Sequence, residues 1–385
     1  MPLIAIHDTS CFYRLHGRPG GPVLMLAHAL GLDHGLWDAQ IADFAEHALV
    51  VRYDLRGHGA SGAPTGDYSI EMLGRDALAL ADALSLPRFS FCGVSVGGLV
   101  GQWIAANVPD RLDRLVLANT SPRVADPSAM ETRRRTVLER GMAPIVDTVM
   151  SRFFSPAVLA RDPPMVSAAR RTLLANSPAG YAASCAAIRD ADLRPALSRI
   201  RTPTLVIGGE HDPSMPWDGH SSALVDGITG ARAVKLATAH LSNLEAPRAF
   251  TAAVLEFIAP PPADPLEAGM AVRRATLGNE YVDRAISRTT PLTREFQRYI
   301  TETAWGRLWT RTTIDRRTRR LLVLAIAATL GRMEEFRLHV RTALAQGMEP
   351  ADIEDVLMTV AVYAGLPAAN HAFHIVSEEL EGKHS

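Results

Sequence analysis

The sequence predicts two domains of different class: an α/β domain with a mostly parallel sheet at residues 1–258, and a small all-α domain at residues 266–385. Three observations lead to this prediction. Short apolar runs bounded by turn residues alternate with helical patterns as far as Phe257, which is typical of a parallel sheet covered on both faces. A proline-rich linker at 259–265 then interrupts the chain, and no strand pattern appears beyond it.

The expected strands are short and apolar, and helical patterns separate several of them. They lie at residues 23–27, 48–53, 89–93, 115–118 and 204–208, and a further short strand ends at Leu236. Residues from about 121 to 200 show helical patterns only, with breaks at Pro156, Pro163-Pro164 and Pro178. An all-helical insertion between two strands of such a sheet is expected to form a lid over an active site.

The C-terminal domain is expected to contain helices only. Residues 292–309 place Phe296, Ile300, Ala304 and Leu308 on one side of a helix. Capping residues, glycines and prolines bound the others. The later helices are expected from Asp315 to about Gly331, up to about Gly347, from Pro350 to Gly365, and on toward Leu380.

Composition and charge exclude several classes of partner and of cellular location. The formal net charge is −1, so neither nucleic acid nor an anionic membrane is expected as a partner. The three cysteines, Cys11, Cys92 and Cys185, are widely spaced and odd in number, which is not the pattern of a disulfide framework. The N-terminus has no secretory pattern, and the apolar run at 321–330 is far shorter than the roughly 20 residues that span a bilayer. A cytoplasmic protein is therefore expected.

One motif indicates a nucleophilic serine. The segment Gly93-Val94-Ser95-Val96-Gly97 follows an expected strand and begins a helix, and it matches the G-x-S-x-G pattern of α/β-hydrolases. This chemistry needs a sharp turn that exposes Ser95 Oγ at the carboxyl end of the sheet, and the flanking glycines allow the close packing of such a turn. A chance glycine-rich turn is the alternative, and the strand–turn–helix context favours the nucleophile.

A serine hydroxyl becomes a good nucleophile when a base takes its proton. In this fold the acid and then the histidine follow the serine along the chain. Asp212 comes after one expected strand and His240 after the next, so Asp212 is expected to orient His240, and His240 to act as general base and then as general acid. His211 is the competing histidine, and position and order favour His240.

The tetrahedral intermediate of acyl transfer needs preorganised N–H donors. The Val96 N–H, directly after the nucleophile, is one expected donor. The second is expected from the loop after the strand at 23–27, where the position of Leu30 favours its N–H as the donor. We interpret His28 of this loop and the turn at 56–61 as structural.

Four segments of the first domain resemble 3-oxoadipate enol-lactone hydrolases. They are residues 52–61, 93–98 and 239–245 around the expected site, and residues 180–194 of the expected lid. The resemblance implies a small lactone substrate with a free carboxylate, for which a lid arginine is the natural partner.

Arg133 lies where that family tends to place such an arginine. A tryptophan often precedes that arginine by three residues in the family, and this chain has Met130 there. The run Arg133-Arg134-Arg135 can also be a solvated basic helix face, which is the alternative interpretation.

The second domain resembles 4-carboxymuconolactone decarboxylase over residues 266–381. The matching segments are residues 269–274, 296–297, 304–306, 309–311, 315–319 and 363–370. The resemblance implies that His339 delivers a proton after loss of CO2, with Glu335 one helical turn away, and that no cofactor or metal takes part. Arg311, Arg319 and Arg320 are candidate carboxylate anchors, and a surface ion pair is the alternative reading of Glu335 and His339.

The two resemblances together predict a bifunctional enzyme of the 3-oxoadipate (β-ketoadipate) pathway, whose expected ligands are small lactone carboxylates. The helical domain would decarboxylate 4-carboxymuconolactone to 3-oxoadipate enol-lactone, and the hydrolase domain would open that lactone to 3-oxoadipate. A homo-oligomer assembled through the helical domain is expected. One rival is a serine esterase of other specificity whose helical domain only mediates oligomerisation, and the other is a binding protein without activity on a hydrolase scaffold.

Overall fold

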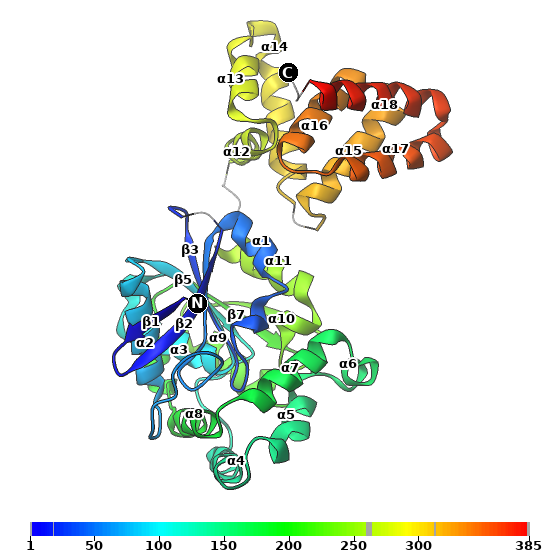
Figure 1. Cartoon of the computed structure of the whole chain (residues 1–385). Helices are drawn as coiled ribbons and strands as arrows, with labels where there is room; N and C mark the ends of the chain where they lie inside the picture. Colours follow the sequence, from blue (N-terminus) through cyan, green and yellow to red (C-terminus); the bar gives the residue numbers. More distant parts are fainter. Residues whose placement is uncertain (1, 18, 259–263, 312, 383–385) are drawn as a thin grey trace. The chain divides into compact units, whose positions relative to one another are not determined.

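The computed structural model describes residues 2–17, 19–258, 264–311 and 313–382 (Figure 1). Its internal contacts divide the chain into two units, Met1–Ala259 and Pro260–Ser385. Most of the linker expected at 259–265 lies outside the described residues. Its last two residues, Asp264 and Pro265, already begin a helix, because the Asp264 carboxylate accepts a hydrogen bond from Leu266 N–H at 2.9 Å and caps that helix.

The first unit is built on an eight-stranded sheet with the order β1-β2-β4-β3-β5-β6-β7-β8. The pairs from β4 to β8 are parallel, whereas β1 pairs with β2 and β2 with β4 in the antiparallel sense. The strands are β1 (Leu3–Ile6), β2 (Thr9–His16), β3 (Val23–Ala27), β4 (Leu49–Tyr53), β5 (Phe89–Val94), β6 (Leu112–Ala118), β7 (Thr204–Gly209) and β8 (Arg232–Leu236). The predicted α/β class is confirmed, and β1 and β2 are additions that the apolar runs did not indicate.

Helices cover the sheet on both faces. Every residue of β4, β5 and β7 is buried, as expected for central strands without a solvated face. Helix α2 packs with α3, and α1 packs with α11. These helices are α1 (Ile41–His47), α2 (Ile70–Ala83), α3 (Val96–Asn107) and α11 (Pro247–Ile258).

A helical lid lies between β6 and β7, as the sequence predicts (Figure 1). Pro156, Pro164 and Pro178 each occupy the first turn of a helix, where a missing backbone N–H costs no hydrogen bond. The expected breaks are therefore helix starts. The lid helices are α4 (Pro127–Arg140), α5 (Val146–Phe153), α6 (Pro156–Arg161), α7 (Pro164–Ala175) and α8 (Pro178–Asp190).

The second unit is helical throughout the part that the structure describes. Asp315 caps α15 as expected, since its carboxylate accepts a hydrogen bond from Thr318 N–H at 2.8 Å. The helices α12 and α13 precede the first one expected from the sequence. The elements are α12 (Pro265–Leu277), α13 (Asn279–Ser287), α14 (Pro291–Ile300), the wide-turn helix η6 (Thr301–Leu308), α15 (Arg316–Thr329), α16 (Met333–Ala345), α17 (Pro350–Ala364) and α18 (Leu366–Glu381).

Two apolar clusters hold the second unit together. The larger joins α15 to α18 around Leu324, Phe336 and Leu357, which are fully buried. The smaller joins α12, α13 and η6 around Val282 and two tryptophans. Among the described residues, no helix of the chain is long and apolar enough to cross a membrane.

Candidate active site

Ser95 lies in a strained turn between β5 and α3. Its backbone has φ 57° and ψ −115°, in a region that residues with a side chain rarely adopt. A Cβ on Gly93 would lie 2.2 Å from the carbonyl of Gly97, and a Cβ on Gly97 would lie 2.4 Å from the carbonyl oxygen of Ala27. Glycine at both positions is therefore required for this turn, as the motif predicts.

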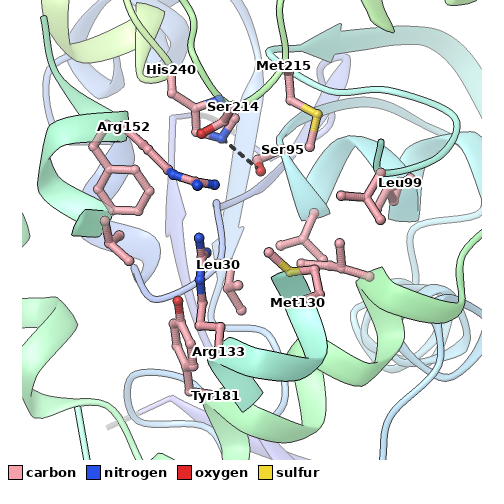
Figure 2. A pocket seen from close by; sticks show the side chains of 15 residues that line it. Leu30, Ser95, Leu99, Met130, Arg133, Arg152, Tyr181, Ser214, Met215 and His240 are labelled. Atoms are coloured by element: carbon pink, nitrogen blue, oxygen red, sulfur yellow. Dashed lines mark hydrogen bonds between the residues drawn. The ribbon is translucent and has the colours of Figure 1, made fainter. Parts of the chain in front are cut away.

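The structure brings Ser95, His240 and Asp212 into one hydrogen-bonded line, and Figure 2 shows the contact between Ser95 and His240. His240 Nε2 lies 3.0 Å from Ser95 Oγ, and His240 Nδ1 lies 2.7 Å from Asp212 Oδ2. In this arrangement Nδ1–H donates to the carboxylate and Nε2 accepts from the serine hydroxyl. All three side chains are buried, which shields the proton transfer from bulk water.

Asp212 is held as a carboxylate. Burial alone would raise the pKa of Asp212, but the charge and hydrogen bond of His240 and donors such as Met215 N–H and the Asn119 amide bring it below its ordinary value. An ionised Asp212 is the form that can orient His240 and stabilise the imidazolium.

Two further residues support this arrangement, and the sequence reasoning did not identify them. Asn119 Nδ2 donates to Asp212 Oδ2 at 3.1 Å, and the Phe153 ring is stacked on His240 with 6.2 Å between ring centroids. Asn119 directly follows β6, so its position at a strand's carboxyl end was a usable signal. Phe153 comes from lid helix α5, and its backbone carbonyl accepts a hydrogen bond from Leu241 N–H, so only the tertiary fold reveals it.

Two neutral histidines fasten the loop that carries Leu30. His28 Nε2 accepts a hydrogen bond from Leu55 N–H at 2.9 Å, and His58 Nε2 accepts one from Gly31 N–H at 3.1 Å. Burial lowers the pKa of both histidines, that of His58 to about 3. This agrees with the interpretation of His28 and of the turn at 56–61 as structural. His211, the competing histidine, is exposed.

We expect the first unit to lose stability as the pH falls from about 6.5. An unfolded chain protonates histidine near pH 6.5, whereas folded His58 stays neutral down to about pH 3, so the unfolded state binds the extra proton throughout this window. Each such histidine contributes a slope of about 1.4 kcal/mol per pH unit. Urea unfolding followed between pH 7 and 4.5 measures this slope.

His58→Gln keeps an acceptor for Gly31 N–H and should reduce the slope, while His211→Gln should not. An identical slope in His58→Gln would refute the assignment.

A cavity opens beside Ser95 and His240 (Figure 2). The expected oxyanion donors Leu30 and Val96 both lie in its wall. Arg133 also lies in the wall, and so does a second lid arginine, Arg152, which the sequence reasoning missed. The other lining residues are mostly apolar: Leu99, Val124, Met130, Val149, Phe153, Tyr181, Ile188, Ser214 and Met215.

The second candidate site surrounds His339 on α16. His339 is 2% exposed, so the reading of His339 and Glu335 as a surface ion pair is wrong for the histidine. His339 Nε2 lies 3.1 Å from Glu335 Oε1, and the imidazole is stacked on Trp309 at 6.0 Å between ring centroids. His339 Nδ1 is buried and has no hydrogen-bond partner among the described residues. The hydrogen bond from His339 lowers the pKa of Glu335, and the charge of Arg273 adds to this effect.

The three arginines expected to anchor substrate carboxylates either bind backbone and amide groups or lie at the surface. Arg319 donates to the backbone carbonyls of Arg311 and Ile314, and Arg320 donates to the carbonyl of Thr276 and to the side chain of Gln346. Both are buried in these contacts, whereas Arg311 is exposed.

Arg273 on α12 is 7% exposed, and its hydrogen bonds go to the neutral side chains of Thr301 and Gln297. It is therefore a buried cation close enough to Glu335 for their charges to interact. Arg273 lies in the segment 269–274 that resembles the decarboxylase family, but the sequence alone does not show that it lies near Glu335 of α16, some sixty residues away.

Comparison with known proteins agrees with this division. Residues 22–247 match the family described as alpha/beta hydrolase fold, and residues 294–378 match the carboxymuconolactone decarboxylase family. The chain is 38% identical to 3-oxoadipate enol-lactonase 2 of Acinetobacter baylyi, over 65% of this chain and 94% of that protein. A further part is 34% identical to the 4-carboxymuconolactone decarboxylase of the same organism, over 29% of this chain and 82% of that protein.

A solved structure supports the same relationship for the first unit. The enol-lactonase of Burkholderia xenovorans is 39% identical and superposes with a TM-score of 0.66. The match covers 67% of this chain and 99% of that one.

Proposed function

Because the chain belongs to the alpha/beta hydrolase fold family and carries a second domain of the carboxymuconolactone decarboxylase family, we propose that it catalyses two consecutive reactions. The second unit would decarboxylate 4-carboxymuconolactone to 3-oxoadipate enol-lactone, and the first would hydrolyse this lactone to 3-oxoadipate. The product of one unit is the substrate of the other. The cytoplasmic location predicted from the sequence suits such reactions on small carboxylates.

In the hydrolase reaction, Ser95 Oγ would attack the lactone carbonyl carbon while His240 takes its proton. The Leu30 and Val96 N–H groups would stabilise the oxyanion. The ring C–O bond then breaks, and the enolate leaves and becomes a ketone after it takes up a proton. Water, activated by His240, attacks the acyl-enzyme and releases the new carboxylate, which restores Ser95.

In the decarboxylase reaction, the bond between the ring carbon and the departing CO2 breaks, and its electron pair is delocalised through the C=C bond into the lactone carbonyl. His339 would then deliver a proton to the resulting carbanion. Since His339 Nε2 faces Glu335, the proton would leave from Nδ1, the ring nitrogen without a partner. Arg273, whose charge interacts with that of Glu335, is a further candidate for attracting a substrate carboxylate, beside Arg311, Arg319 and Arg320.

This proposal rests on the combination of two features in one chain. The Ser95–His240–Asp212 line lies beside a cavity with two arginines, and the same chain has a decarboxylase-family domain. The decisive experiment offers 4-carboxymuconolactone to the purified full chain and follows both CO2 and 3-oxoadipate. Release of both supports the proposal. Ester turnover without CO2 release would instead favour a serine esterase with a helical oligomerisation module.

Exposed apolar side chains on the second unit support assembly of a homo-oligomer. On α14, Leu292 is 90% exposed and Phe296 60% exposed, so the apolar side expected at 292–309 is only partly covered. At the junction of α17 and α18, Tyr363 is 87% exposed and Leu366 74% exposed. Apolar faces of this extent on a small helical domain are best covered by a second copy of the chain.

Separating the units tests this assembly. We expect residues 1–258 alone to sediment as a monomer and to keep enol-lactone hydrolysis, because the triad and the cavity lie within them. Residues 264–385 alone should self-associate, because they expose the apolar side chains described above. Analytical sedimentation of both fragments gives the answer. A well-folded and active monomer of the C-terminal fragment would contradict oligomerisation through this unit.

A further inference from the structure

Several arginines of the lid are neutralised by carboxylates. Arg134 binds Asp67 at 2.7 Å, and Arg170 binds Asp147 at 2.7 Å. Arg189 binds Glu131 and Asp190. In contrast, Arg133 and Arg152 form no ion pair with a carboxylate among the described residues, although both line the cavity beside Ser95.

The surroundings of Arg133 and Arg152 raise the free energy of holding these two charges without a counter-charge. Neither aspartate nor glutamate is among the residues that line the described cavity. Burial lowers the pKa of the Arg152 guanidinium, and the charge of Arg133 lowers it further. A guanidinium keeps its positive charge in such a place because its intrinsic pKa is very high. The free lid therefore holds two unpaired, mutually repelling positive charges, a state that a bound anion would stabilise.

Both side chains extend into the cavity, from different lid helices (Figure 2). Arg133 comes from α4 and lies beside Tyr181, whereas Arg152 comes from α5 and points into the cavity on the side of His240 and Ser95. An anionic group between them would meet donors from two directions. Because a guanidinium presents its N–H groups in a planar fork, each arginine can donate two parallel hydrogen bonds to a carboxylate.

We propose that Arg152 is a substrate-binding residue that holds the free carboxylate of the substrate together with Arg133, and that this pair makes the hydrolase site selective for anionic lactones and esters. The inference rests on the proposed lactone hydrolysis at Ser95 and adds the residue that determines its substrate class. The carboxylate joins α4 to α5 when it binds. It thereby fixes the lactone carbonyl beside Ser95 at one end of the cavity while the anionic end lies between the arginines.

Two substrates separate charge recognition from chemistry. The full chain is assayed with 3-oxoadipate enol-lactone, which is anionic, and with p-nitrophenyl acetate, which is neutral. In Arg152→Met we expect the ratio of kcat/KM for the anionic over the neutral substrate to fall by about 10- to 100-fold, the range for losing a hydrogen bond to a charged group. Arg135→Met removes one charge from the exposed side of α4, and it should leave the ratio unchanged.

A binding measurement gives a second readout that does not depend on the lactone. Adipate should inhibit hydrolysis of the neutral ester competitively in the native chain, and adipamide, which has the same length and no charge, should inhibit far less. The inhibition constant of adipate should rise by a similar factor in Arg152→Met. Arg152→Lys keeps the charge without the planar fork, so an intermediate value is expected. If Arg152→Met does not fold, Arg152→Lys carries the test alone, with a smaller rise expected.

The possible outcomes distinguish this inference from the function on which it rests. An unchanged substrate ratio and unchanged adipate inhibition in the Arg152 variants would overturn the role of Arg152. If the native chain cleaves the neutral ester and binds adipate through Arg152 but leaves the enol-lactone intact, the anion site stands and the proposed lactone substrate is wrong.

Discussion

Replacing Ser95 with alanine should abolish lactone hydrolysis and leave CO2 release nearly intact. Ser95 Oγ is the atom that lies 3.0 Å from His240 Nε2, and alanine removes it without filling the cavity. A loss of about 10⁴-fold or more is the usual scale for removing the nucleophile of such a triad. The turn itself needs glycines at its flanks and not the hydroxyl, so the fold should persist.

The measurement supplies 4-carboxymuconolactone to Ser95→Ala and follows CO2 and both lactone products with time. Enol-lactone should accumulate, because the first step continues while the second is blocked. Ser214→Ala is the matched control, since Ser214 also lines the cavity but bonds through its backbone N–H to Asp212. If Ser95→Ala also stopped CO2 release, the assignment of the two reactions to separate sites would fail.

The second large effect is expected at His339. If His339 delivers the proton after CO2 loss, His339→Gln should lower decarboxylation by about 10²-fold or more, the usual scale for losing a positioned acid–base group. Glutamine has a similar length and can bond to Glu335, but it does not titrate. Hydrolysis of the enol-lactone should be unaffected, because His339 lies in the other unit. Glu335→Gln should have a smaller effect if Glu335 only orients the imidazole.

A purely structural His339 would behave differently. The side chain is 2% exposed and packs on Trp309, so its replacement would lower the melting temperature while the rate per folded molecule stayed the same. Turnover and melting temperature are therefore measured on one His339→Gln preparation. His371→Gln, at an exposed histidine of α18, controls for the change of residue type. Normal turnover with lowered stability would assign the proton donation to another group.

The sequence predicts those parts of the structure that local physics determines. Continuous apolar runs locate β3, β4, β5, β6 and β7, because a strand buried on both faces needs apolar residues throughout. The hairpin of β1 and β2 was missed, since most of its residues are partly exposed and give no such run. The first helix expected beyond the linker begins at residue 292, so α12 and α13 are not among the predicted helices, although the linker overlaps α12 only at Pro265.

The residues of the candidate sites also fall into two groups, those that the local sequence predicts and those that it does not. Ser95, Asp212 and His240 could be predicted because each lies at the end of a strand of one parallel sheet, and such ends meet at one edge. Arg152 and Arg273 could not, because their positions depend on how separate helices pack. Nothing local in the sequence distinguishes Arg152 from the ion-paired arginines of the lid.

The hydrogen bond from Leu241 N–H to the Phe153 carbonyl has a mechanical consequence. It ties the end of α5 to the residue that follows His240, and the stacked Phe153 ring adds a second tie to the imidazole itself. A movement of α5 away from the sheet would have to break these two contacts or displace the loop that carries His240. We therefore expect that opening this part of the lid to admit substrate also misaligns His240, so that the general base works only when the lid is closed.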